Sequence, residues 1–170
     1  MRRLGIGAWI LPSLLIVPAC AHAPNASPDP AVRIAVLRPV VDHALAFNGA
    51  QIPIIDPTPV GRYSCKCPSD GTYLRTELPS LDSSTLASYC TATPPRALTR
   101  RELRDLWNPS PLISRLGWKS TPLRFSPIGV GESGSQALVC VAEIQCEAFY
   151  LLQREGSGWK VVDMALGIQN

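Results

Sequence analysis

The segment that decides the fold is Leu123 to Met164, LRFSPIGVGESGSQALVCVAEIQCEAFYLLQREGSGWKVVDM. Apolar and polar residues alternate along it in four runs, and glycine-rich turns separate the first two runs and the last two. This arrangement is typical of antiparallel strands joined by tight turns. The predicted strands are Leu123–Val130, Gln136–Ala142, Phe149–Gln153 and Trp159–Ala165.

The last predicted strand is largely apolar on both faces. Simple alternation places Trp159, Val161, Asp163 and Ala165 on one face, and Lys160, Val162, Met164 and Leu166 on the other. We expect one face of the sheet to pack against helices. The other face needs its own cover, which is a loop, a partner subunit or a cavity that holds a ligand.

The first half of the chain has the pattern of helices that pack on this sheet. Asp29-Pro30 has the residue types of a helix N-cap and a first helical position. Apolar residues then recur at four-residue spacing up to Asn48-Gly49, which is a typical helix end. Pro39 removes a backbone donor and predicts a kink. The predicted apolar stripe is Val32, Ala35, Val36, Val40, Ala44 and Leu45.

Shorter elements are predicted between this helix and the sheet. Gln51–Ile55 reads as an edge strand because it contains a proline. Val60–Ser80 is rich in Gly, Pro, Ser and Cys, which indicates an irregular loop held by disulfides. Leu81–Cys90 predicts a helix with Leu86 and Tyr89 facing inward, and the capping box Thr99–Glu102 opens a last helix that runs to Trp107.

The composition favours one domain and excludes some partners. The chain has 170 residues, of which 46% are hydrophobic and 17% are charged, which suits a single α+β domain at 30–170. Without Arg2 and Arg3, 14 basic and 13 acidic residues remain, a balance of +1. We therefore expect no nucleic acid partner, and a membrane only through a lipid anchor. The basic cluster Arg96, Arg100, Arg101 and Arg104 reads as a solvated helix face, with an anionic ligand as the alternative that Glu102 and Asp105 weaken.

Met1–Ala23 has the three parts of an export signal: a basic start, an apolar run and small residues. Two processing routes fit it. Val17-Pro18-Ala19-Cys20 resembles the lipobox of bacterial lipoproteins, which makes Cys20 the lipid attachment site, whereas Ala19-Cys20-Ala21 resembles an ordinary cleavage site. Residues 24–29 then form a tether. Either route predicts a periplasmic or secreted protein.

Five cysteines follow the export signal: Cys65, Cys67, Cys90, Cys140 and Cys146. In an oxidising compartment such a set predicts disulfides with one cysteine left over. We expect Cys140 to pair with Cys146 across the connecting turn, and Cys65 or Cys67 to pair with Cys90. The one-residue spacing of Cys65-Lys66-Cys67 does not match zinc-binding pairs, so no metal site is predicted.

Two resemblances extend this interpretation. The order of elements resembles the cystatin-like and NTF2-like α+β cones, in which N-terminal helices pack on a curved antiparallel sheet. The last 50 residues or so also resemble a family of uncharacterised secreted bacterial proteins with an S-x-x-G strand, an ALVYV-type strand, a Cys-containing turn, a YxLLE strand and a GxWKV strand. The matching segments are Ser126–Gly129, Ala137–Val141, Cys146, Tyr150–Gln153 and Gly158–Val161.

The sequence favours a binding protein over an enzyme. Gly131-Glu132-Ser133-Gly134 lacks the G-x-S-x-G spacing of a nucleophile elbow, and no phosphate loop, dinucleotide fingerprint or H-E-x-x-H motif occurs. We therefore expect an exported, lipid-anchored, non-enzymatic protein that needs no cofactor and binds a protein partner or a small apolar ligand. A third interpretation is an envelope structural or inhibitor protein that inserts the loop at 60–80.

An enzymatic alternative follows from the resemblance to the NTF2-like fold. Some members are isomerases, cyclases or dehydratases that use a carboxylate or a histidine inside the cone. The resemblance then implies acid–base roles for Asp163, for Glu143, and for Asp42 together with His43.

Overall fold

A computed structural model describes residues 29–47, 54–56, 65–67, 71–93, 95–106, 122–142 and 146–167. The predicted export signal, Cys20 and the tether up to residue 28 lie outside the described residues, as does Glu143. The elements are α1 Pro30–Phe47, β1 Ile54–Ile55, α2 Thr72–Glu77, α3 Ser83–Thr91, α4 Arg100–Leu106, β2 Pro122–Val130, β3 Gln136–Ala142, β4 Glu147–Glu155 and β5 Gly158–Leu166. The predicted α+β class is confirmed.

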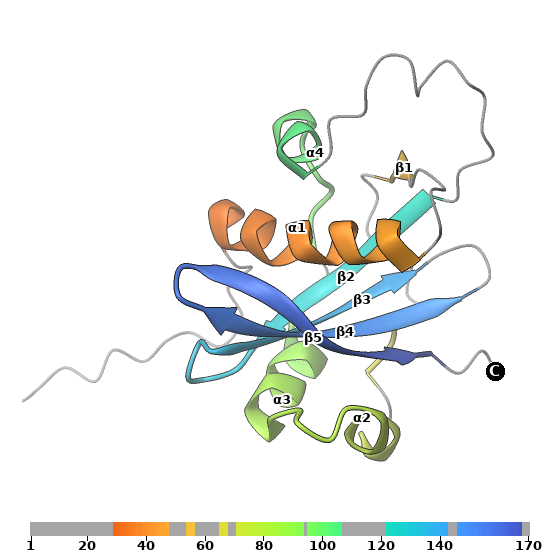
Figure 1. Ribbon diagram of the computed structural model, residues 1–170, viewed down its shortest axis with the longest axis vertical. Helices are drawn as coiled ribbons and strands as arrows, with labels where there is room; N and C mark the ends of the chain where they lie inside the picture. The colour runs from red at the N-terminus through yellow and green to blue at the C-terminus, as the bar shows by residue number, and fades with distance from the viewer. Residues whose placement is uncertain are drawn as a thin grey trace, which may run out of the picture.

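The sheet has the strand order β1-β2-β3-β4-β5, and β2 to β5 form the predicted antiparallel meander. The short β1 pairs in parallel with β2 at one edge, and β5 forms the other edge (Figure 1). The two-residue turn between β4 and β5 begins at Gly156, whose φ of 61° is what a type II′ turn requires at its first central position.

Helices cover both faces of the sheet, with α1 and α4 on one side and α2 and α3 on the other (Figure 1). The core is therefore divided into two clusters. The α1 side contains Val36, Leu37, Val40, Val41, Ala44, Ile55, Leu98, Leu106, Leu123, Phe125, Ile128, Ala137, Val139, Val141, Tyr150 and Leu152. The other side contains Cys65, Leu74, Leu78, Leu81, Leu86, Tyr89, Leu138, Cys140, Ala142, Phe149, Leu151 and Ala165.

The second apolar face of the sheet is thus covered from within the chain. The predicted irregular loop at 60–80 was wrong in part, because it contains α2. Leu74, Leu78 and Leu81 recur at helical spacing and are at most 8% exposed, so they supply the missing apolar stripe. The buried side chain of Gln136 fastens this layer to β3: its Nε2 donates to the Ser80 carbonyl (2.8 Å), and its Oε1 accepts from the backbone N–H of Asp82 (2.7 Å).

Helix α1 begins as predicted. The Oδ1 atom of Asp29 accepts a hydrogen bond from the backbone N–H of Ala31 (2.7 Å), which satisfies one of the free donors of the first turn. The helix runs through Pro39 to Phe47. Its buried stripe is wider than predicted and includes Leu37 and Val41, whereas Val32 remains 39% exposed.

A β-bulge interrupts β2 at the centre of the sheet. Phe125 pairs with Val141 and Ile128 pairs with Val139, so Ser126 and Pro127 together oppose Cys140. The buried Oγ of Ser126 accepts from the backbone N–H of Cys140 (2.9 Å) and donates to the Pro127 carbonyl (2.6 Å). The Ser126 hydroxyl therefore accepts from the backbone N–H of Cys140, which the bulge leaves without its regular acceptor on β2.

Gly129 allows α3 to lie directly against β2. A Cβ atom at this position would come within 2.4 Å of the Tyr89 backbone nitrogen and 2.5 Å of its Cα. One residue along the strand, the backbone N–H of Val130 donates to the Oγ of Ser88 in α3 (3.1 Å). Ser126 and Gly129 are the fixed residues of the S-x-x-G motif, so the motif has a structural explanation: the serine completes the bulge and the glycine admits the helix.

Replacing Gly129 by alanine should lower the free energy of unfolding by about 3 kcal/mol, because helix backbone would have to move. Gly158→Ala is the matched control in another strand, since its Cβ would meet only the Glu155 carbonyl at 3.9 Å and should change stability by less than about 0.5 kcal/mol. Urea unfolding followed by circular dichroism measures both variants. Equal effects of the two substitutions would contradict the close contact between α3 and β2.

A second bulge lies in β5 and corrects the predicted alternation of this strand. Leu152 pairs with Val161 and Leu151 pairs with Asp163, so Val162 is the extra residue. Trp159, Val161 and Met164 consequently pack on the α1 side of the sheet, whereas Ala165 belongs to the opposite cluster. The prediction was wrong beyond Val161 because an inserted residue reverses the facing of every side chain after it.

Candidate functional site

The structure does not bring the sequence-predicted acid–base residues together. The ring of His43 contacts the ring of Tyr150 edge-on at 5.6 Å between centroids, and Tyr150 belongs to the α1-side cluster. Asp163 is paired across the strands with Leu151, which belongs to the opposite cluster. Directly opposed residues share a face, so His43 and Asp163 lie on different sides of the sheet. Asp42 is exposed on α1.

Asp163 has a local structural role. It is partly buried next to the bulge of β5, and its Oδ1 accepts a hydrogen bond from the backbone N–H of Met164 (2.9 Å). A carboxylate that accepts from a neighbouring edge-strand amide also places a charge on that edge, which discourages pairing with another strand.

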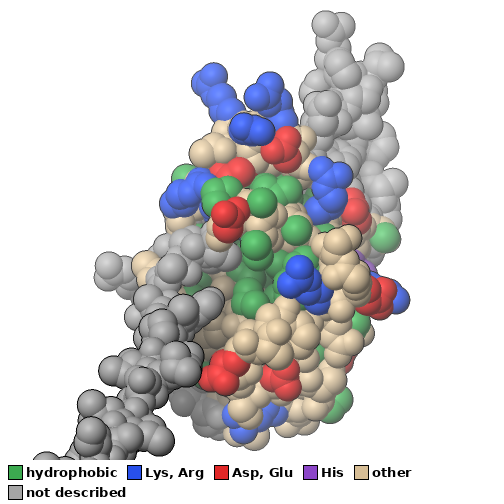
Figure 2. Space-filling view, turned by 90° about the vertical axis from the view of Figure 1, so that its left-hand side faces the viewer, with side chains coloured by type: hydrophobic (Ala, Val, Ile, Leu, Met, Phe, Trp, Pro, Cys, Tyr) green, Lys and Arg blue, Asp and Glu red, His purple; other side chains and the backbone are tan. Residues whose placement is uncertain are grey.

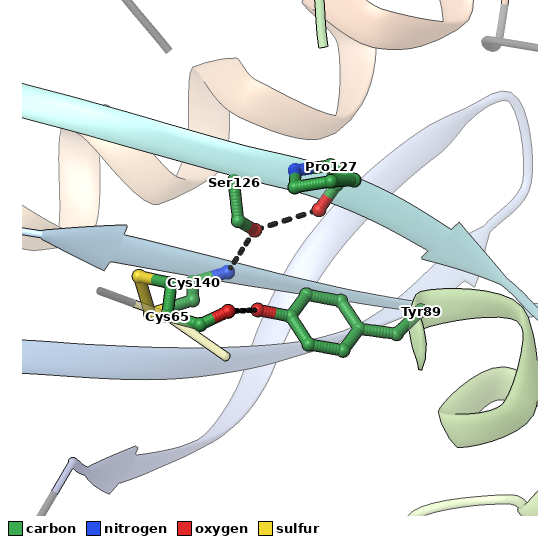
Figure 3. Close-up of a disulfide and its surroundings, with 5 residues drawn as sticks. All are labelled: Cys65, Tyr89, Ser126, Pro127 and Cys140. Atoms are coloured by element: carbon green, nitrogen blue, oxygen red, sulfur yellow. Dashed lines mark hydrogen bonds between the residues drawn. A yellow bond between two sulfur atoms is a disulfide. The ribbon is translucent and has the colours of Figure 1, made fainter. Parts of the chain in front are cut away.

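The cysteine pairing differs from the prediction in one of its two bonds. Cys67 pairs with Cys90, which is one of the two expected alternatives. Cys140 pairs with Cys65 instead of Cys146, at a Cα–Cα distance of 5.6 Å (Figure 3). The predicted Cys140–Cys146 bond is wrong.

The strand register explains this difference. Cys140 is paired with Phe149, and the last pair of this hairpin is Ala142 with Glu147. Cys146 therefore lies three positions further along, roughly 10 Å from Cys140, which is beyond the reach of a disulfide. Cys146 is exposed and outside both disulfides.

Tyr89 reinforces the Cys65–Cys140 disulfide. Its hydroxyl donates to the Cys65 carbonyl (2.6 Å), and Figure 3 shows the ring extending from α3 to this bond. Cys65 has a φ of 56°, a strained conformation for a residue with a side chain, which the disulfide and the hydrogen bond hold in place. Burial raises the pKa of the Tyr89 hydroxyl well above its usual value, so it remains a protonated donor.

Cys65, Cys140 and Glu147 are the only group of potential metal ligands found among the described residues, with ligand atoms within 4.8 Å of one another. Thiolates are the cysteine form that binds metals. Both sulfurs here are bonded to each other, so this group does not fit a metal ion in the disulfide form.

A buried ion network joins α1 to α4, and it was not predicted. The carboxylate of Glu102 accepts two hydrogen bonds from Arg96, at 2.8 Å each, and lies 3.8 Å from the Nη1 atom of Arg33. The Nη2 atom of Arg33 donates to the Arg96 carbonyl (2.8 Å). The Arg33 and Glu102 side chains are each only 6% exposed. The available sequence signal was an arginine within the apolar stripe of a helix, beside Val36 and Leu37.

Glu102 also closes the predicted capping box. Its Oε2 accepts from the backbone N–H of Thr99 (2.8 Å), and its own N–H donates to the Thr99 Oγ1 (3.2 Å). The hydrogen bonds from Arg96, together with those from Thr99, lower the pKa of the Glu102 carboxyl to about 2, although burial opposes the shift. The carboxylate is therefore charged under all ordinary conditions.

An apolar surface remains at the end of the sheet where the hairpin turns lie. Val130 and Val161 are at the two ends of a row of paired residues that runs through Ala137 and Leu152 on the α1 side of the sheet. Trp159 follows on the same face, and Ile34 of α1 packs against the same cluster. We call these four partly buried side chains, Ile34, Val130, Trp159 and Val161, the hairpin-end patch.

Figure 2 views this end of the molecule. Hydrophobic side chains gather in the middle of the face, and Lys and Arg side chains lie above them, where α4 is found. An apolar centre with a charged surround is the usual arrangement of a protein-binding surface.

Comparison with known protein families, with curated proteins and with solved structures finds no match. None of the described helices is long and apolar enough to cross a membrane. The fold and the two disulfides define a disulfide-bonded α+β protein, and disulfides of this kind indicate an oxidising, extracytoplasmic environment.

Proposed function

We propose that this protein is an exported, lipid-anchored, non-enzymatic binding protein of the bacterial envelope, and that a partner protein binds at the hairpin-end patch. The observation that carries the proposal is Trp159, a partly exposed tryptophan on the apolar α1 side of the sheet, paired across the strands with the exposed Arg154. Tryptophan and arginine are the residue types that contribute most to binding at protein interfaces.

The location of the patch also supports this function. The second face of the sheet, which looked available from the sequence, is filled by α2 and α3. The hairpin-end patch is built on paired strands and on α1, so its side chains are held in place before a partner arrives. A preformed surface loses less conformational entropy on binding. Export and attachment at Cys20 are proposed from the N-terminal sequence, and the disulfides support an extracytoplasmic location.

In-cell photo-crosslinking tests the binding proposal. A photoreactive phenylalanine derivative replaces Val32, which is 39% exposed in the first turn of α1, the helix that contributes Ile34 to the patch. The exported full chain should give a discrete adduct with one envelope protein. Trp159→Ala should weaken that interaction at least ~30-fold and remove the adduct.

Val162→Ala is the matched control, because Val162 is 40% exposed on the same strand but outside the patch. It should leave the adduct unchanged. Thermal unfolding of both variants verifies that each is folded. An adduct that survives Trp159→Ala in a folded protein, or that Val162→Ala removes equally, would overturn the proposed site.

One observation favours the second candidate, a small NTF2-like enzyme with the cone fold that the resemblance implies. The Nδ1 atom of His43 is buried and has no hydrogen-bond partner within the described part of the chain. A buried polar atom that lacks a partner is one that a bound ligand would satisfy, and histidine is the residue that most often performs acid–base catalysis. His43→Gln should then abolish turnover of an apolar carbonyl substrate without unfolding the protein, and an unchanged rate would exclude this candidate.

A further inference from the structure

Helix α4 presents a positively charged outer surface. Arg100, Arg101 and Arg104 are all exposed, and they are three of the seven residues of the helix. In the sequence, Glu102 and Asp105 lie in the same stretch and reduce the positive charge expected for this helix. In the structure Glu102 is 5% exposed and already bound by Arg96, so of these two acidic residues only Asp105 is exposed beside the three arginines.

The position of α4 makes this charge accessible. The helix stands away from the sheet on the outer side of α1 (Figure 1), and Lys and Arg side chains project from this region in Figure 2. It is held firmly, because Arg33 contacts Glu102 and the Nη2 atom of Arg38 donates to the Asp105 carbonyl. The near-neutral total charge of the chain therefore conceals a local basic surface.

The α4 surface also lies close to the point where the chain enters the domain. Arg33, which contacts Glu102, is in the first turn of α1, and α1 begins at Pro30. Pro30 lies ten positions after Cys20. Such a segment spans at most about 35 Å when extended and about 17 Å on average as a flexible coil. A lipid at Cys20 would therefore keep α4 within reach of the membrane surface.

We propose that Arg100, Arg101 and Arg104 dock the domain on the anionic lipid surface of the membrane that carries its anchor. The inference rests on the proposed lipid anchoring, but it uses a surface separate from the hairpin-end patch. Each arginine near an anionic bilayer strengthens the partition by about fivefold, so three contribute roughly 100-fold. Each such contact is weak by itself. A lipid-anchored tether would hold the arginines close to the membrane, so their effective concentration at the lipid surface would be high.

Vesicle cosedimentation tests the docking surface separately from the anchor. The exported and processed chain carrying Cys20→Ser, which cannot be lipidated, is mixed with vesicles of phosphatidylcholine containing phosphatidylglycerol, or of phosphatidylcholine alone. At low salt it should bind only the anionic vesicles, and molar salt should release it because the screening length falls to about 3 Å. The triple variant Arg100→Gln, Arg101→Gln, Arg104→Gln should lose about 100-fold in partition.

A second triple variant controls for total charge. Arg75→Gln, Arg154→Gln and Lys160→Gln remove three exposed positive charges from elsewhere on the molecule and should change the partition by less than about fivefold. Equal losses in both triple variants, or equal binding to neutral vesicles, would overturn the proposal. Arginine-dependent binding to poly-glutamate without binding to anionic vesicles would also overturn it, in favour of an acidic protein. Failure of the chain with native Trp159 to give any Val32 adduct, with vesicle binding intact, would reject the proposed partner binding alone.

Discussion

Replacing Cys65 and Cys140 together by alanine should lower the free energy of unfolding by about 4.5 kcal/mol, whereas replacing Cys67 and Cys90 should cost about 3.4 kcal/mol. The difference follows from loop length in the chain-entropy model, because the first bond closes a separation of 75 residues and the second a separation of 23. Alanine suits the test because Cys140 is fully buried and a serine hydroxyl there would need a partner.

The Cys65–Cys140 bond has a second effect on the fold. It fastens the segment at residues 65–67 to the middle of β3, beneath the layer formed by α2 and α3. Its loss also releases the strained Cys65 backbone and weakens the contact of Tyr89 with the Cys65 carbonyl. We therefore expect the double variant to expose the second apolar face, which an increase in binding of an apolar fluorescent dye would report.

Urea unfolding under non-reducing conditions measures these differences, with Cys146→Ala as the control. Cys146 is exposed and outside both disulfides, so its replacement should change stability by less than about 0.5 kcal/mol. A loss with Cys146→Ala as large as that of the variant lacking both Cys65 and Cys140 would show that Cys140 pairs with Cys146 and would contradict the register of the β3–β4 hairpin.

The strands were predictable because their signals are local. Alternation and glycine turns fix the bounds of β3 at both ends, and of β2, β4 and β5 to within about two residues. The bulges at Ser126 and Val162 were not predictable, because a bulge is defined by the partner strand that the residue faces. The error in the Cys140 pairing also arose from the partner strand. Which cysteine lies close to Cys140 depends on the strand register and not on the spacing of the cysteines in the chain.

The candidate surfaces were predictable only in part. The arginines of α4 and the capping box at Glu102 were evident in the sequence, but the burial of Glu102 depends on Arg33, about 70 residues earlier. Trp159 was placed on a face of β5 without its neighbours being known. The sequence did not predict that α2 covers the second face of the sheet, because Leu74 and Leu78 lie among turn-forming residues. The helix there is stabilised by tertiary packing of its apolar side chains and not by local sequence preference.

Glu102→Gln should lower the free energy of unfolding by about 3 kcal/mol at neutral pH, because it leaves the buried guanidinium of Arg33 without a compensating charge. Burial already lowers the pKa of Arg33, and the Glu102 carboxylate is the group that opposes this shift. Glutamine keeps the capping box, since its side-chain oxygen still accepts from the Thr99 N–H. The substitution therefore separates the ion network from the cap.

The effect should depend on pH in a defined direction. The folded-state pKa of Glu102 is lowered to about 2 from its ordinary value of 4.5, so the carboxylate stabilises the fold fully above pH 4.5 and progressively less as the pH falls toward 2. The stability difference between the native chain and Glu102→Gln should shrink over this same interval. Glu132→Gln, in the exposed turn between β2 and β3, is the control and should show little effect at any pH. Thermal unfolding between pH 2 and 7 measures both, and a difference for Glu102→Gln that stays constant down to pH 2 would show that the network does not hold a charged carboxylate.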